Sequence, residues 1–107
     1  MPKRGRVVKT RAPKVEAKLA EGWLFIADTR SYPGGWGRGK TEQAALTYLR
    51  GHVGSAFVKD TGYVIWCAHP DSRVDHHGDI LWPEGEKPLL VEKRLVNDLD
   101  LSEFEAV

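Results

Sequence analysis

The sequence has a single cysteine, Cys67, and no hydrophobic segment of the length that crosses a membrane. One cysteine cannot form an internal disulfide, so we expect the fold to depend on a packed core in a reducing, cytoplasmic setting. Because a membrane-spanning helix needs roughly 20 apolar residues, no membrane partner is predicted. A strong net charge is also lacking, since 16 basic and 15 acidic residues leave +1 at pH 7.

The charges are unevenly distributed along the 107 residues. Residues 1–14 carry six bases and no acid, whereas residues 95–107 carry four acids and no base. We predict a flexible basic arm over 1–14, one domain over 15–98 and an acidic C-terminal tail over 99–107. The arm either aids solubility or binds nucleic-acid phosphates. Its candidate nucleic-acid-binding residues are Lys3, Arg4, Arg6, Lys9, Arg11 and Lys14.

Hydrophobic periodicity predicts an α+β domain with a mostly antiparallel sheet of about four to five strands and one main helix packed on one face. Alternating residues over 15–19 and an apolar run over 23–27 indicate a hairpin. The run over 63–68 has the highest strand propensity, and Cys67 and Trp66 within it are expected in the core. A short strand is expected over 80–82 and a last strand over 89–96, where apolar residues flank Glu92-Lys93-Arg94.

The main helix is predicted to begin after Thr41, an N-cap residue. Ala45, Leu49 and Val53, joined by Leu46 and Tyr48, are assigned to its apolar face, and Gly54 is expected to end it. Residues 28–40 precede the helix and contain four glycines and one proline, so they are predicted to be a loop.

This loop contains a nucleotide-binding motif, because Gly34 is followed at the required spacing by Gly39-Lys40-Thr41. In that interpretation backbone N–H groups would hold phosphates, with Lys40 on the terminal phosphates and Thr41 on magnesium. Two features count against it. The preceding strand ends at Ala27, and one helix cannot build the doubly wound sheet that carries such motifs. We therefore expect that the protein is not an enzyme and binds no cofactor. A P-loop-like nucleotide-dependent or metal-dependent enzyme stays as the third hypothesis, after two binding functions.

The same region resembles the HicB-like antitoxin family. Trp23–Ala27, the turn Pro33-Gly34, then Gly39-Lys40-Thr41 and the helical Gln43–Leu46 follow in the order of that family's motifs, over about residues 15–54. The resemblance implies a partial RNase H-like β-β-β-α-β fold without catalytic acids. It also implies a protein partner, often a small toxin ribonuclease, and assembly into homo-oligomers. Lys40 stands where the family has an acid.

The first hypothesis is accordingly a non-enzymatic binding module for another protein, antitoxin- or inhibitor-like, that acts through a sheet edge or the 30–41 loop. Trp36 is surrounded by glycines, and an aromatic side chain in such a loop is typical of partner contacts. The alternative is a nucleic-acid-binding protein that uses the same loop with the basic arm. For the loop itself, the alternative to any binding role is a surface loop whose glycines are there only because the backbone requires positive φ angles. The candidate partner-binding residues are Arg30, Tyr32, Trp36, Arg38 and Lys40.

Seven potential metal ligands fall within thirteen positions of one polar segment. No zinc-type spacing is present, so we predict a surface loop with Asx-type turns and no metal site. A transition-metal site is the alternative. The seven residues are Cys67, His69, Asp71, Asp75, His76, His77 and Asp79.

Overall fold

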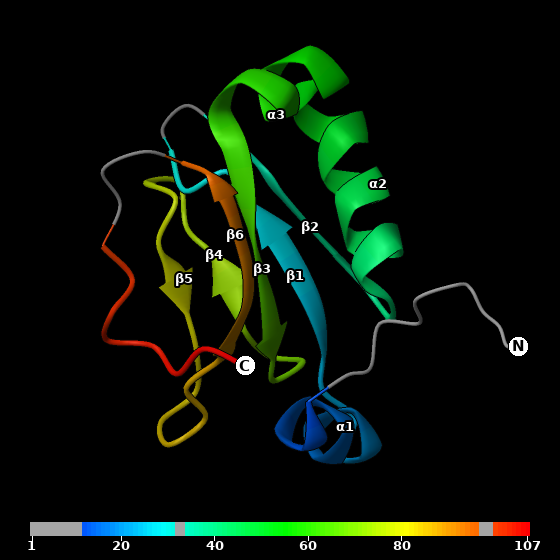
Figure 1. The fold of residues 1–107 in the computed structure, drawn as a ribbon, viewed down its shortest axis with the longest axis vertical. Helices are drawn as coiled ribbons and strands as arrows, with labels where there is room; N and C mark the ends of the chain where they lie inside the picture. The colour runs from blue at the N-terminus through cyan, green and yellow to red at the C-terminus, as the bar shows by residue number, and fades with distance from the viewer. Residues whose placement is uncertain (1–11, 32–33, 97–99) are drawn as a thin grey trace, which may run out of the picture.

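The structure is a computed structural model that describes residues 12–31, 34–96 and 100–107 (Figure 1). These ranges contain both helices and strands, and none of the helices there combines the length and apolar character that crossing a bilayer requires. The elements are α1 (Pro13–Ala20), β1 (Leu24–Asp28), β2 (Trp36–Gly39), α2 (Glu42–Val53), α3 (Ser55–Thr61), β3 (Gly62–Ala68), β4 (Arg73–Val74), β5 (Ile80–Leu81) and β6 (Leu89–Leu95).

The main sheet has four strands in the order β2-β1-β3-β6, and each neighbouring pair is antiparallel. β4 and β5 form a separate antiparallel pair. The fold is therefore α+β with a mostly antiparallel sheet, which confirms the predicted class. β1 and β3 lie in the middle because their residues are almost all apolar and buried.

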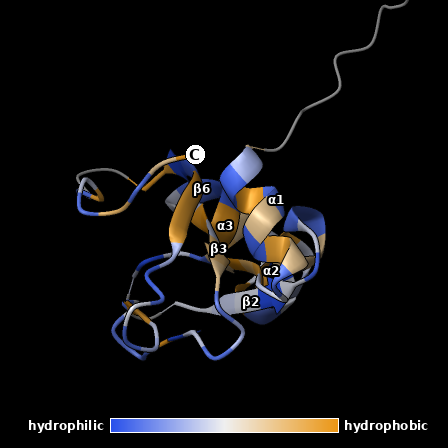
Figure 2. Cartoon of the chain, turned by 90° about the horizontal axis from the view of Figure 1, so that it is seen from below, coloured by the Kyte–Doolittle hydropathy of each residue, from blue (hydrophilic) through white to orange (hydrophobic). Residues whose placement is uncertain are grey.

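One face of the sheet is covered by helices (Figure 1). Phe25 and Ile65 on this face pack in one core cluster with Leu46 and Leu49 of α2 and Val15 of α1. Figure 2 shows hydrophobic residues where the helices meet the sheet, whereas the long connection on the other side of the molecule is largely hydrophilic. Burial of these apolar side chains is the main stabilising contribution to the domain.

The opposite face is covered by the β4–β5 hairpin and the C-terminal segment. Trp66 is fully buried there, and its ring lies 4.6 Å from the ring of Phe104. Leu101 is buried in the same cluster, and a parallel bridge joins Leu90 of β6 to Ala106. Residues 101–107, predicted as part of an acidic tail, thus pack on the sheet through two buried apolar side chains.

The predicted strand over 15–19 is wrong, because these residues lie in α1. Pro13 occupies the first helical turn, where its fixed φ is favourable, and Val15 and Leu19 contact the core. A spacing of four residues fits both a strand face and a helix face, so the alternating pattern did not distinguish them. Lys14, predicted in the flexible arm, also lies in α1 and pairs with Glu105.

The prediction for α2 is confirmed at both ends. The Thr41 hydroxyl accepts a hydrogen bond from Ala44 N–H at 3.0 Å, and Gly54 ends the helix with φ +93°. Ala45 and Leu49 are buried as expected, but Tyr48, assigned to the apolar face, is 60% exposed. Tyr48 therefore lies on the side of α2 that faces solvent.

Candidate functional site

The loop predicted over 28–40 is wrong in part, because its glycine-rich second half contains a strand. Trp36–Gly39 form β2, whose residues pair with Asp28–Phe25 of β1. A Cβ atom at Gly37 would lie 2.7 Å from Leu49 N and 2.9 Å from Ala45 O, and one at Gly39 would lie 2.8 Å from Ala45 N. The two glycines are needed because α2 packs with its backbone directly on β2.

This geometry corrects the nucleotide-binding interpretation of Gly34-to-Thr41. A phosphate-binding loop requires successive N–H groups that converge on one anion. In the extended strand β2, successive N–H groups point to opposite sides, and Gly37 and Gly39 face α2. The glycine spacing reflects helix-on-strand packing.

β2 is an edge strand of the sheet, with an outer edge that no described strand pairs. Thr29 N–H donates to Gly35 O at 3.3 Å, and the register places Gly37 opposite Ala27 and Gly39 opposite Phe25. Bonded and non-bonded pairs alternate in an antiparallel ladder. The glycines therefore bond to β1, and the backbone N–H and C=O groups of Trp36 and Arg38 point away from the sheet.

A pocket of about 410 Å³ lies along this edge. Trp36, Gly37 and Arg38 of β2 line one side, and Tyr48 and His52 of α2 line the other. The rings of Tyr48 and His52 stack at 6.0 Å, and the Arg38 guanidinium lies 5.2 Å from the Trp36 ring. We call these five residues the edge pocket. It joins exposed aromatic rings to outward-facing backbone groups.

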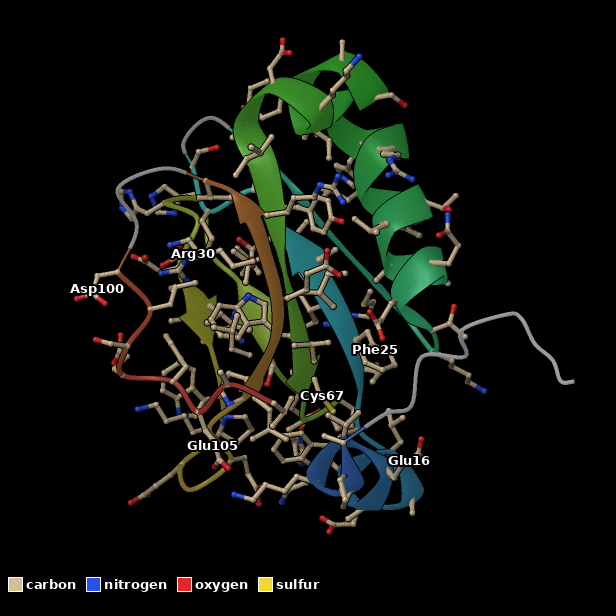
Figure 3. All side chains as sticks on the ribbon, in the orientation of Figure 1. Glu16, Phe25, Arg30, Cys67, Asp100 and Glu105 are labelled. Atoms are coloured by element: carbon tan, nitrogen blue, oxygen red, sulfur yellow. The ribbon has the colours of Figure 1, made fainter. Side chains whose placement is uncertain are left out.

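Three of the predicted partner-binding residues have different roles in the structure. Arg38 donates to Pro70 O at 3.0 Å and to Ser72 O at 2.9 Å, so its guanidinium also holds the 70–72 turn. Arg30 has a side chain only 11% exposed, 3.8 Å from Asp79, and lies on the β4–β5 side of the sheet (Figure 3). Lys40 is exposed beyond β2 and does not line the edge pocket.

The structure does not place the rest of the predicted contact residues. Tyr32 and the arm residues Lys3, Arg4, Arg6, Lys9 and Arg11 lie outside the described ranges. Sequence reasoning identified Trp36 and Arg38 but missed Tyr48 and His52. The signal for these two was present in their spacing of four on α2, which puts them on one helix face.

A buried carboxyl group lies at the end of β1, where the strand pairing brings it opposite a residue of the edge pocket. Asp28 is opposite Trp36, is 0% exposed, and accepts hydrogen bonds from Trp66 Nε1 and from Arg30 N–H, both at 2.6 Å. Burial raises the pKa of Asp28 to about 7, although these hydrogen bonds and the Arg30 charge act in the other direction. Because Asp28 has no exposed surface, it joins β1 to β3 and does not contact a ligand.

The histidine-rich segment forms the predicted Asx-type turn. Asp75 Oδ1 accepts from His77 N–H at 2.9 Å and from Asp79 N–H at 3.0 Å, and these backbone hydrogen bonds lower the pKa of Asp75. Among the described residues no three His, Cys, Asp or Glu side chains are grouped as metal ligands. Cys67 is buried in the core cluster on the helix side.

Comparisons with protein-family models, with curated proteins and with solved structures find no match to this chain. The edge pocket is therefore the feature from which a function can be proposed.

Proposed function

We propose that this protein is a non-enzymatic binding module that takes an extended segment of a partner protein at the edge of β2. The observation that carries the proposal is the combination of two features at one place. Trp36 and Arg38 present outward backbone N–H and C=O groups, and the edge pocket lies beside them.

Strand addition uses both features. Hydrogen bonds from the partner's main chain to an open edge provide affinity, and pockets for alternate side chains provide specificity. Two residues of β2 face outward, so the added strand is short. The edge pocket, with Tyr48 60% exposed, would take one apolar or aromatic side chain of the partner. Tyr, Trp and Arg are the residues that most often dominate binding energy at interfaces, and this pocket has one of each.

The antitoxin- or inhibitor-like role implied by the HicB-like resemblance belongs to this proposal, as does self-association. A HicB-like partner would be a small toxin ribonuclease, and a second copy of the chain would pair its β2 edge with this one. The lone, buried Cys67 is compatible with the cytoplasmic location expected from the sequence.

The test compares two substitutions at one position. Arg38→Pro removes the outward N–H and adds a ring at the edge, whereas Arg38→Ala loses the same hydrogen bonds to Pro70 and Ser72 but keeps the N–H. We expect Arg38→Ala to capture the same partner from the native host as wild type but more weakly, because it loses one side chain of the edge pocket, and Arg38→Pro to bind at least about tenfold more weakly than Arg38→Ala. Tyr48→Ala should weaken capture through loss of the pocket wall.

Capture that Arg38→Pro and Tyr48→Ala leave unchanged would overturn the proposal. Sedimentation of the purified chain identifies the case of a second copy, because self-association would then be lost in Arg38→Pro and retained in Arg38→Ala. Circular dichroism of each variant confirms that the comparison is made between folded proteins.

A further inference from the structure

A second pocket lies where the last turn of α2, α3, the start of β3 and the end of β6 meet. Its volume is about 610 Å³, within the range of roughly 300–1,000 Å³ that is common for small-molecule sites. It shares no lining residue with the edge pocket. The residues that matter here are Arg50, Lys59, Arg94, Tyr63, Val58 and Leu95.

Three basic side chains from three elements line this pocket. Arg50 is in the last turn of α2, Lys59 is on α3 and Arg94 is on β6. Within the described part of the chain none of the three forms an ion pair, whereas Lys14, Lys18, Arg30 and Lys87 each lie within 4.0 Å of a carboxylate. Like charges around one cavity repel one another, so their convergence favours an anion between them.

The nearest acid on β6 does not remove this excess of positive charge. Glu92 accepts a hydrogen bond from the Tyr63 hydroxyl at 3.1 Å and does not line the pocket. Burial and the Glu92 carboxylate raise the pKa of Tyr63, although the Arg94 side chain acts on the same hydroxyl in the other direction, so the phenol stays protonated and neutral. The residues that line the pocket thus include three bases and no carboxylate.

The backbone around Arg94 is held in an unusual conformation. Gly62 has φ +91°, and a Cβ atom there would collide with Arg94 O. Leu95 and Val96 follow with φ +65° and +29°, and Val96 N–H donates to Thr61 O at 3.0 Å. Non-glycine residues at positive φ are strained and persist where the surrounding structure enforces them. This strained turn leaves Leu95 55% exposed beside the three bases.

From these observations we propose that the pocket binds a phosphate group, with Arg50, Lys59 and Arg94 around its oxygens and Val58 and Leu95 against the attached apolar part of the ligand. Arginine presents a planar pair of donors that matches phosphate, and a phosphate dianion balances three bases better than one carboxylate does. The proposal does not depend on strand addition at β2.

Titration of the ¹⁵N-labelled full chain tests it with three probes: inorganic pyrophosphate, a short single-stranded oligonucleotide and a poly-glutamate peptide of matched charge. We expect pyrophosphate to shift the amide signals of Lys59, Gly62 and Arg94, while those of Gly37 and Tyr48 at the edge pocket stay in place. Stronger binding of the oligonucleotide at equal phosphate concentration would identify a nucleic-acid strand as the source of the phosphate. Binding of pyrophosphate alone would identify a small phosphorylated ligand.

Arg50→Gln and Arg94→Gln should each weaken phosphate binding by about tenfold, which corresponds to about 1.4 kcal/mol. Arg73→Gln is the matched control, since Arg73 is exposed on β4 and does not line the pocket. Three results would overturn the proposal: no shift with either phosphate probe, equal affinity for poly-glutamate, or the same loss in Arg73→Gln.

Discussion

The two edges of the main sheet differ in how they are protected. The β6 edge carries Glu92-Lys93-Arg94, and the C-terminal segment covers one end of it, where Leu90 N–H donates to Glu105 O at 2.8 Å. Charged residues and covering segments are common devices against unwanted strand pairing. The β2 edge has outward amide groups at Trp36 and Arg38, with aromatic side chains next to them. The two edges therefore differ in whether the backbone groups that point away from the sheet are covered by another described segment.

The difference also concerns what holds each edge in place. The C-terminal segment that covers the β6 edge is held by side-chain packing, because the ring of Phe104 lies 4.6 Å from the ring of Trp66 and 5.6 Å from the ring of Trp82. β2 depends on the absence of side chains, because Gly37 and Gly39 let α2 approach its backbone. Substitutions that remove atoms should therefore damage the first edge, and substitutions that add atoms should damage the second.

The largest effect is expected from Phe104→Ala. Phe104 is 7% exposed, and truncation of a buried Phe costs about 3–5 kcal/mol of unfolding free energy. We expect denaturant unfolding to show this loss, and hydrogen exchange to show reduced protection of the Leu90 and Val107 amides. Phe57→Ala, at a partly exposed position of α3, is the control and should cost less. Unchanged protection of Leu90 would show that the C-terminal segment does not close the β6 edge.

A smaller loss is expected from Gly37→Ala. The added Cβ would meet the backbone of α2 at 2.7–2.9 Å, and overpacking of this kind costs about 1–3 kcal/mol. Gly51→Ala is the matched control, because a Cβ atom there meets nothing within 4 Å. A Gly→Ala change inside a helix raises the free energy of unfolding by about 0.5–1 kcal/mol. In chemical denaturation we expect Gly37→Ala to lower the free energy of unfolding and Gly51→Ala to raise it. Equal stability of Gly37→Ala and wild type would contradict the account of β2.

The elements that the sequence predicted correctly are those with strong local signals. α2 has an N-cap at Thr41 and a terminating Gly54, and β1 and β3 are continuous apolar runs that became central strands. α1 was missed because the spacing from Val15 to Leu19 fits two periods, and β2 was missed because its glycines indicate a loop by composition.

The candidate site was predictable only in part for a related reason. Trp36 stood out because glycines surround it, but the edge pocket exists only once α2 has packed on β2. Tyr48 was assigned to the core because it lies near Leu49 in the helical pattern, and its exposure is decided by which side of α2 meets the sheet. Such tertiary contacts have no local signature in the sequence.

The third effect is small over any single pH unit and is a pH dependence at the β2 side of the sheet. Asp28 has its pKa raised from 3.8 to about 7, so the folded state keeps a proton that the unfolded chain has already lost. Stability should therefore fall as the pH rises from about 4 to about 7, with a slope of at most about 1.4 kcal/mol per pH unit. Arg30 lowers this pKa and Asp79 raises it, so Asp79→Asn should shift the transition to lower pH.

Asp28→Asn isolates this contribution, because all other residues are the same in the two proteins. We expect the difference in unfolding free energy between wild type and Asp28→Asn to vary with pH in this window. Amide exchange of β1 next to β2 should increase toward pH 7 after correction for the intrinsic rate, while that of β6 at Leu90 should not. An equal response of the two edges would show that Asp28 stabilises the whole sheet and not the β2 side alone.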